Sequence, residues 1–289
     1  MTFEYLNKKR RQKRIRQLLD TFRTAFWIKE HRWFVRCQWY PQSTDAYISL
    51  YTLPFVFDEF NDLCEPIEFA STCQDDRDYC SYDCVRFMKI GNEIQNFSLP
   101  PIRFPGLTYL EINLPMHTDI WSMIPTLDHL TSLTVFVQEK EEESAVSELK
   151  ALFIRAPSLY LLAIDGVTAL RLAQFSITST SIRRLSLEDI DNICFNSEEC
   201  SILARSPLGR QCEVLSLVVQ NRSNIIELIN SMSNLRSLCC TNEYDRQKKN
   251  LSLSSDEESL DIWLQHHLPS SCTYSVKESC GYAELWIAK

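Results

Sequence analysis

The sequence is poor in glycine, with only 5 among its 289 residues. Glycine-rich loops, which let backbone N–H groups close around phosphates, are therefore not expected. No apolar run approaches the ~20 residues that cross a bilayer, and no apolar segment follows the basic amino-terminal stretch. The sequence motifs of nucleophilic serines, zinc hydrolases and nucleotide-binding loops are missing as well. We therefore expect neither an enzyme nor a membrane protein.

The 12 cysteines are not spaced as metal ligands. Cys73, Cys80 and Cys84 follow C-x6-C-x3-C without a nearby histidine, whereas structural zinc sites use tighter pairs and four ligands. Cys212 and Cys240 occupy apolar positions of strand patterns, where a thiol packs as a small hydrophobe. We expect no metal and no cofactor. Because no secretion signal is predicted, we also expect reduced thiols and a cytoplasmic or nuclear location.

The formal net charge of −8 is unevenly distributed. Residues 8–16 carry seven basic side chains and no acid, so the remainder carries about −15 (−8 − 7). The basic residues are Lys8, Lys9, Arg10, Arg11, Lys13, Arg14 and Arg16. They fall in a helix predicted over residues 3–24. The patch is either a nuclear-import or nucleic-acid site, or a solvated helix that leads into the fold. No aromatic residue interleaves it, so a stacking surface for single strands is not indicated.

One pattern, L-x-x-L-x-L, recurs through the middle of the chain. Its copies begin at Val85, Leu107, Leu130, Leu159, Ile182, Cys212 and Leu235, at spacings of 22 to 30 residues. A period in the twenties built on this pattern is typical of leucine-rich repeats. Helix-sized segments follow the strands, at 117–130, 144–157, 196–209 and 223–232. The sequence therefore predicts an α/β leucine-rich-repeat solenoid over residues 85–242, with a parallel sheet on its concave side and short helices on its convex side.

The remaining segments are predicted to cap both ends, because a solenoid otherwise exposes apolar surface there. We predict a basic helix over 1–24 and an aromatic amino-terminal cap over 25–84, with strands at 31–39 and 46–55 and an acidic loop at 57–84. Residues 243–289 are predicted to form a loop, a helix at 256–269 and a strand pair at 271–279 and 282–289. Trp263, Trp286 and Ile287 are expected to cover the last repeat. Inserts at 139–144 and 189–201 are expected to be loops.

Side chains alternate along a strand, so the third, fifth and seventh places of each repeat should point away from the core. The predicted partner-binding residues on this face are Phe87, Tyr109, Glu111, Phe136, Asp165, Arg184 and Glu188. Aromatic and arginine side chains are frequent hot spots of protein interfaces. The face is not basic, so duplex nucleic acid is a poor fit. The alternative for each single residue is that it is an ordinary solvent-facing strand residue.

The stretches FWIKEHRWFVRC, RAPSLYLLAI, SPLGRQCEVLSLVV and INSMSNLRSL resemble the leucine-rich-repeat region of F-box-type proteins, as do YLEINLP…IWSMIPTLDHLTSLTV and the ending WLQHHLPSSC…LWIAK. The resemblance covers residues 22–289. It implies non-catalytic protein recognition, similar to the substrate receptor of a cullin-RING (Skp-cullin-F-box) ubiquitin ligase. Leu53-Pro54 does not open an F-box here, so a Skp-type adaptor is expected only if an F-box lies upstream. The alternative function is a nuclear or nucleic-acid-associated protein that works through residues 8–16.

Overall fold

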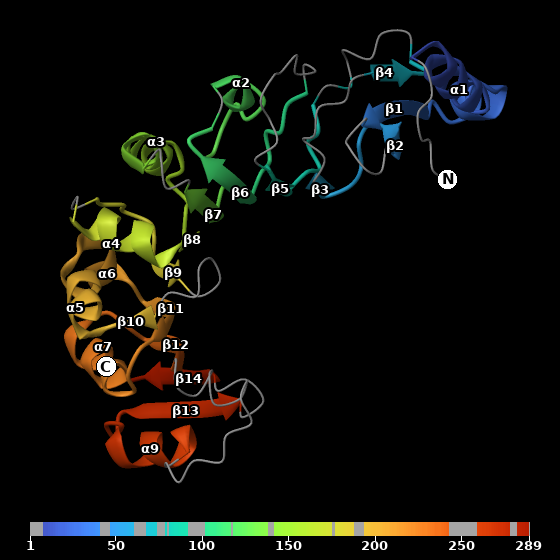
Figure 1. Cartoon of the computed structure of the whole chain (residues 1–289). Helices are drawn as coiled ribbons and strands as arrows, with labels where there is room; N and C mark the ends of the chain where they lie inside the picture. Colours follow the sequence, from blue (N-terminus) through green and yellow to red (C-terminus); the bar gives the residue numbers. More distant parts are fainter. Residues whose placement is uncertain are drawn as a thin grey trace. The chain divides into compact units, whose positions relative to one another are not determined.

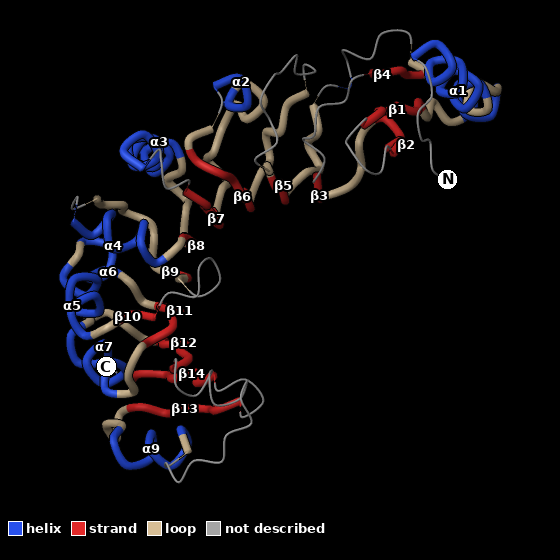
Figure 2. The backbone as a smooth tube through the Cα atoms, in the orientation of Figure 1, coloured by secondary structure: helices blue, strands red, loops and turns tan. Residues whose placement is uncertain are grey.

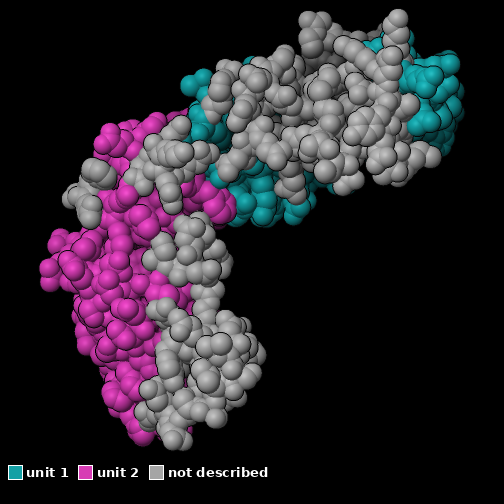
Figure 3. Space-filling model, in the orientation of Figure 1, with its two compact units in different colours: residues 1–129 teal, residues 130–289 magenta. Residues whose placement is uncertain are grey.

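The protein is described from a computed structural model, in which we describe residues 8–40, 47–60, 68–73, 79, 81–91, 102–116, 118–137, 142–174, 177–187, 194–242, 259–277 and 282–288. It is a mixed α/β protein with a large, mostly parallel sheet. Two compact units divide the chain, residues 1–129 (unit 1) and 130–289 (unit 2) (Figure 3).

Unit 1 opens with helix α1 (Lys8–Asp20), which is shorter than the helix predicted over 3–24. Residues 1–7 lie outside the described part of the chain. Ile15 and Leu19 are four residues apart and therefore share one face of the helix. Both are buried, and they pack with Val35 and Cys37 in one apolar cluster. This cluster attaches the helix to the sheet that follows, and it leaves the basic side of α1 exposed.

That sheet is antiparallel, with strand β1 (Phe34–Tyr40) between β2 (Tyr47–Leu53) and β4 (Glu68–Ser71). Strands β1 and β2 confirm the two predicted in the aromatic segment. A π-helix, η1 (Phe26–Glu30), precedes β1 and was not predicted. Pro54, at which the second strand was expected to end, directly follows β2.

The parallel strands of unit 1 are β3 (Glu59–Phe60), β5 (Phe87–Lys89) and β6 (Tyr109–Leu114), paired in that order. Strands β3 and β4 both lie inside the segment 57–84 that was predicted to be an acidic loop, so that prediction was wrong at residues 59–60 and 68–71. Helix α2 (Thr118–Trp121) is far shorter than the segment 117–130 predicted for it. Pro125 disfavours the helical conformation in the residue before it, so one helix could not continue through the whole predicted segment.

The strands of unit 2 lie in the order β13-β14-β12-β11-β9-β8-β7. Strands β7 (Ser132–Val137), β8 (Leu161–Ile164), β9 (Arg184–Ser186), β11 (Val214–Val219) and β12 (Ser237–Asn242) are mutually parallel. The predicted carboxy-terminal strand pair, β13 (Cys272–Lys277) and β14 (Tyr282–Ile287), is confirmed, and β14 joins β12 in the antiparallel sense. The strand pair therefore extends the sheet.

Helices accompany the strands of unit 2. They are α3 (Glu142–Arg155), α4 (Gly166–Gln174), α5 (Ser197–Arg205), α6 (Pro207–Gln211), α7 (Ser223–Ser231) and α9 (Leu260–His267). Helices α4, α5, α6 and α7 lie together on one side of the strands (Figures 1 and 2). The helices predicted at 144–157, 223–232 and 256–269 are confirmed within a few residues. Helix α4 was not predicted, and the one predicted at 196–209 is split into α5 and α6 at Ser206.

The first, fourth and sixth places of all seven predicted repeat copies are buried. Equivalent places also face each other across the strands. Leu162 lies opposite both Leu133 and Leu185, and Leu215 lies opposite both Leu185 and Leu238. Within each unit the observed strand pairs therefore confirm the predicted alignment of the repeats, and these places form the core of the parallel strands.

A carbonyl ladder runs along the amino-terminal edge of the parallel strands. One backbone carbonyl accepts two N–H groups from the next strand, at 2.7–3.1 Å between nitrogen and oxygen. The accepting residues are Asp58, Arg86, Thr131, Tyr160, Arg183 and Glu213. Because the contacts use main-chain atoms, the ladder fixes the start of each strand whatever side chain is present.

The insert 189–201 is not simply the predicted loop. Strand β10 (Cys194–Phe195) pairs in parallel with Val218 and Val219 of β11. Asn196 then begins helix α5 with a capping box, in which its side chain accepts from the Glu199 N–H and the Glu199 carboxylate accepts from the Asn196 N–H. Asn196 is thus the amino-terminal cap of α5. Residues 188–193, which include the start of this insert, lie outside the described residues. In the other insert, 139–144, helix α3 begins at Glu142.

Candidate interaction face

We use the term strand face for the third, fifth and seventh places of the repeats and the residues in register with them. In unit 1 its main feature is an aromatic pair. The rings of Phe87 and Tyr109 lie 5.9 Å apart, centroid to centroid, on neighbouring strands. Phe87 is 43% exposed, and Glu59 of β3 lies opposite it. The alternation along β5 and β6 therefore presents aromatic surface to solvent, as predicted.

A charged pair lies beside these rings. Lys89 Nζ is 3.0 Å from Glu111 Oε2, and the Tyr109 hydroxyl donates to the same oxygen at 2.8 Å. The hydrogen bond to Glu111, together with its negative charge, raises the pKa of Lys89. The structure thus brings three predicted binding residues, Phe87, Tyr109 and Glu111, into one small group.

In unit 2 the strand face is less open than predicted. Arg184 is exposed, with Leu161 and Val214 opposite it on the neighbouring strands, and Phe136 is half-buried. Three residues expected on the solvent-facing rows are instead buried: Ser216, Val218 and Cys239. The prediction of a continuous exposed face was therefore wrong along β11 and in the middle of β12.

Asp165 is not a surface binding residue, so this prediction was wrong. It is only 5% exposed, and its Oδ1 accepts the Thr168 N–H at 2.7 Å. Strand β8 ends at Ile164, so the next residue serves as the amino-terminal cap of α4, where aspartate is favoured. Its other oxygen, Oδ2, has no hydrogen-bond partner among the described residues. Glu188, the last of the predicted set, lies outside the described part of the chain.

Trp286 belongs to the strand face, although it was expected to cover the last repeat. It lies opposite Ser237 of β12 and is 44% exposed. Its neighbours Leu285 and Ile287 are buried toward the core. Alternation along YAELWI was the signal that could have placed Trp286 on the opposite side from these two. Tyr282, in register with Thr241, adds a second aromatic residue to the same side.

The basic patch lies on the solvent side of α1. Arg10, Lys13, Arg14 and Arg16 are exposed, while the side chains of Lys8, Lys9 and Arg11 are outside the description. An aromatic cluster follows in the chain, in which His31 stacks on Trp33 with 4.4 Å between ring centroids. Both rings are exposed. The exposed basic side chains of α1 make the patch accessible, as both interpretations of the sequence require.

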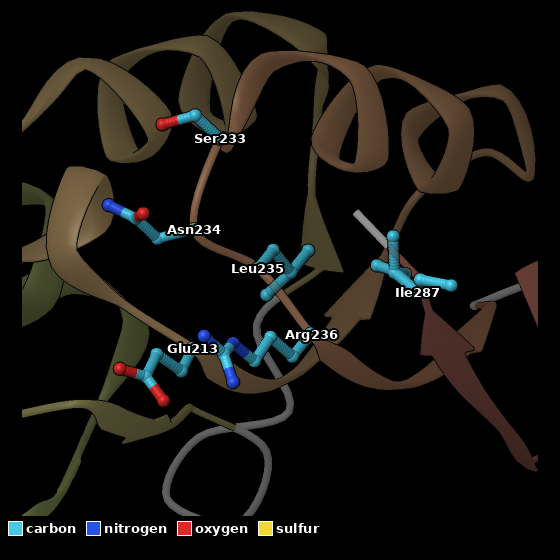
Figure 4. Close-up of a pocket in the computed structure, with 7 residues that line it drawn as sticks. Glu213, Ser233, Asn234, Leu235, Arg236 and Ile287 are labelled. Carbon is cyan, nitrogen blue, oxygen red and sulfur yellow. The ribbon is translucent and has the colours of Figure 1, made fainter. Parts of the chain in front are cut away.

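A polar groove of about 410 Å³ lies at the amino-terminal edge of strands β11 and β12 (Figure 4). Glu213, Ser233, Asn234, Arg236 and the end of β14 line it. Asn234 Nδ2 donates to the Arg210 carbonyl, and the Glu213 carbonyl belongs to the carbonyl ladder. Glu213 also lies 3.6 Å from Arg183, and Arg236 points toward it (Figure 4). Both signs of charge meet here, so the groove favours no ligand of one charge.

The described residues include histidines, cysteines and acidic side chains, which are the usual protein ligands of metal ions. Within them, no group of three or more histidine, cysteine or acidic side chains is placed to hold a metal ion. The described cysteines, Cys73 and Cys84 among them, are free thiols. Burial raises the pKa of Cys37 to about 11 and of Cys200 to about 12, so these thiols stay protonated at neutral pH. No helix in the described ranges has the length and apolarity to cross a bilayer.

The sequence matches no known family model and no curated protein. The strand face must therefore be interpreted from its own geometry. In unit 1 its described part combines two aromatic rings with an acid–base pair, and in unit 2 it combines an exposed tryptophan with an exposed arginine.

Proposed function

We propose that this chain is a leucine-rich-repeat solenoid that binds a protein partner on its strand face, without catalysing a reaction. In this role it would be similar to the substrate receptor of a Skp-cullin-F-box ubiquitin ligase. The observation that carries the proposal is the exposure of Phe87 on the strand face of unit 1 and of Trp286 on that of unit 2, because large apolar rings gain most from burial against a partner.

The solenoid part of the proposal draws on the repeats themselves. All seven copies bury the same three places, and equivalent places pair in register within each unit. In unit 2 the helices between strands gather on one side (Figure 2). Strands that share a register and helices that share a side are typical of stacked repeats, which bury their apolar faces only against their neighbours.

The chemistry of the strand face favours a protein over nucleic acid. Lys89 and Glu111 neutralise each other, and Arg184 and Glu284 bring opposite charges to unit 2. A face that binds phosphates needs an excess of positive charge. Mixed charges around aromatic rings instead resemble the composition of protein interfaces, in which a few aromatic and arginine side chains dominate the binding energy.

The test compares two double variants of the full chain. Proteins captured from cells by wild type are compared with those captured by Phe87→Ala/Trp286→Ala. The control is Ile154→Ala/Val167→Ala, which removes exposed apolar side chains from helices α3 and α4. A captured partner is then purified and its dissociation constant measured. We expect Phe87→Ala/Trp286→Ala to raise the dissociation constant at least about tenfold, or about 1.4 kcal/mol, and the control variant to leave it unchanged. Equal binding by both variants would disprove the proposal.

Recruitment to a ligase is a separate question. A Skp-type adaptor is proposed as a partner only where an F-box precedes the repeats. Binding of purified Skp adaptor to this chain can be measured directly, and its absence would remove ligase recruitment by these residues while leaving recognition on the strand face intact.

A second candidate is a nuclear or nucleic-acid-associated role for α1, favoured by the exposure of Arg10, Lys13, Arg14 and Arg16 opposite the buried Ile15. Changing these four to Gln keeps the apolar face of the helix. If the candidate is right, binding to DNA or RNA falls with rising salt and is lost in this variant. Salt-insensitive binding, or an unchanged variant, counts against it. Both candidates fit a cytoplasmic or nuclear protein.

A further inference from the structure

Three exposed aromatic rings lie together in the segment that follows helix α1. Phe26, at the start of η1, is 48% exposed, Trp33 is 45% exposed, and His31 is exposed as well. His31 stacks on Trp33 with the two planes only 20° apart, and its centroid lies 4.5 Å from that of Phe26. We call these three residues the ring patch. It belongs to unit 1 and shares no residue with the strand face.

Main-chain hydrogen bonds hold the ring patch in place. The His31 N–H donates to the Phe26 carbonyl at 3.2 Å, and the Trp33 N–H donates to the Trp27 carbonyl at 2.8 Å. Arg32, between the two stacked rings, has a φ of 53°, in the left-handed region that residues with a side chain rarely adopt. The rings are therefore presented on a fixed backbone, so a ligand that covers them loses little affinity to ordering.

The ring patch is connected to helix α1 through Trp27. The Trp27 ring lies 5.8 Å from that of Trp33 and 5.0 Å from that of Phe22, centroid to centroid. Phe22 and Trp27 both pack against the apolar cluster that contains Ile15 and Leu19 of α1. The exposed rings and the basic helix are therefore attached to the same small core, although they are separate in the sequence.

The charge of this region is strongly positive. Residues 8–33 hold ten basic and two acidic side chains, a formal net charge of +8 (10 − 2). Lys29 and Arg32 are exposed next to the rings, and neither forms an ion pair with a described residue. Glu30 is the one acidic side chain among residues 21–33. The region therefore attracts an anionic ligand.

A ligand for this region has to combine two kinds of group. The cations of α1, with no acid among residues 8–16, favour a ligand that carries several negative charges in a row. The exposed rings favour flat groups that stack on them. Single-stranded nucleic acid offers both, because its phosphates repeat along the backbone and its unpaired bases leave their faces free.

We propose that the ring patch stacks the unpaired bases of a single-stranded nucleic acid whose phosphates are held by α1. The inference rests on the second candidate function and gives it a class of ligand. No aromatic side chain lies within residues 8–16, so the sequence did not indicate a stacking surface there. The fold supplies the rings from residues 26–33 instead. A duplex keeps its bases stacked on one another and offers few of them to the ring patch.

Two other anionic partners fit this region less well. A basic helix binds a membrane surface by burying its apolar side among the lipids, but Ile15 and Leu19 of α1 are already buried in the protein. An acidic protein segment matches the cations, but its carboxylates offer no flat group to stack on His31 and Trp33. Both partners are included in the experiment as alternatives.

The experiment measures the affinity of the full chain for matched probes by calorimetry. The nucleic-acid probes are a single strand of twelve thymidine nucleotides, a strand of twelve abasic sugar phosphates and a duplex of twelve base pairs. The abasic strand has the charge of the thymidine strand and lacks only the bases. We expect the thymidine strand to bind at least about fivefold more tightly than the abasic strand, the smaller end of what one stacked base contributes.

Variants separate the rings from the charges. Trp33→Ala should weaken binding of the thymidine strand by between about fivefold and a hundredfold, and leave the abasic strand and the duplex unchanged. The salt dependence should also stay unchanged, because the variant removes a ring and no charge. Trp33→Phe keeps a ring and should keep most of the affinity. Lys29→Gln/Arg32→Asn should weaken all three probes and reduce the salt dependence; asparagine is chosen because it tolerates a left-handed φ.

Phe57→Ala is the matched control, because Phe57 is 56% exposed in unit 1 and lies outside the ring patch. It should bind every probe as wild type does. Thermal melting shows whether each variant is folded, and His31→Ala provides the test if Trp33→Ala is not. A peptide of twelve glutamates and vesicles of phosphatidylcholine with phosphatidylserine represent the two other partners.

Four results would overturn the proposal. They are no binding of the thymidine strand up to about 1 mM, equal binding of the thymidine and abasic strands, unchanged thymidine binding by the folded ring variant, or tighter binding of the glutamate peptide or the vesicles that is lost in that variant. Thymidine binding that is lost when the four exposed cations of α1 become Gln, but is unchanged in Trp33→Ala, would overturn this inference and leave the second candidate function standing.

Discussion

Strands β6 and β11 carry the same repeat pattern, yet they differ in how far the side chains on their strand face are buried. Along β6, buried residues alternate with half-buried ones, so Tyr109, Glu111 and Asn113 remain accessible. Along β11, every residue after Val214 is buried. The repeat therefore dictates which side chains enter the core, but not what lies against the opposite side. The strand face is open in unit 1 and closed at β11.

The difference in burial between the two strands is tested most strongly by placing a charge on each strand at the seventh place of its repeat. Val218→Lys buries an unpaired ammonium on β11, and we expect it to lower the free energy of unfolding by about 3–5 kcal/mol. Asn113→Lys on β6 loses only the hydrogen bond to the Ile90 carbonyl, at about 1 kcal/mol. Urea unfolding measures both. Equal losses would show that the two strands are covered alike.

A smaller effect is expected from alkaline pH. Burial raises the pKa of Cys212, at the first place of the β11 repeat, from the ordinary 9.0 to about 12. Above pH 9 the unfolded chain loses this proton while the folded chain keeps it, so stability falls as pH rises from 9 toward 12. The loss is about 1.4 kcal/mol per pH unit.

The matched variants are Cys212→Val and Cys84→Ser, because Cys84 is exposed. Between pH 8 and 10.5 we expect urea unfolding of wild type to lose about 2 kcal/mol more than Cys212→Val. The Cys84→Ser variant should follow wild type. If Cys212→Val loses as much as wild type, the thiol is not buried as described.

The smallest effect concerns the exposed pair on β5 and β6. A double-mutant cycle of Lys89→Ala and Glu111→Gln should give a coupling of about 0.5 kcal/mol or less, as exposed ion pairs do. The coupling energy should shrink as salt is raised from 0.05 to about 0.5 M, because dissolved ions then screen the attraction between two exposed charges over a shorter distance. A salt-independent coupling above about 2 kcal/mol would mean that this part of the strand face is covered like β11.

The sequence predicted the core of the repeats because apolar places recur at fixed spacing, and periodicity is a local signal. It also predicted helix α3, whose apolar residues share one side. It missed β3 because the repeat pattern is incomplete there. A copy beginning at Phe57 would have the charged residue Asp62 at its sixth place, and in the structure Phe57 is exposed. It missed α4 because Asp165 fits both the end of a strand pattern and a helix cap.

The candidate site was harder to predict. Phe87, Tyr109 and Glu111 follow from alternation along single strands. Alternation along YAELWI separates Trp286 from Leu285 and Ile287, but its place on the strand face depends on the antiparallel register of β14 against β12, which links residues 49 apart in sequence (286 − 237). The burial of Ser216 and Val218 depends on what covers β11 from elsewhere in the chain. Contacts between distant segments leave little trace in one sequence, so the open and closed parts of the strand face could not be told apart.

The carbonyl ladder has a consequence for how the repeats tolerate mutation. Its acceptors include an aspartate, two arginines, a threonine, a tyrosine and a glutamate, so the side chain at this place is free to change. Only the loss of a donor N–H would break a rung, and none of the 11 prolines falls at a donor position. A repeat can thus change the residue that supplies the carbonyl while its strands keep their alignment at this edge of the sheet.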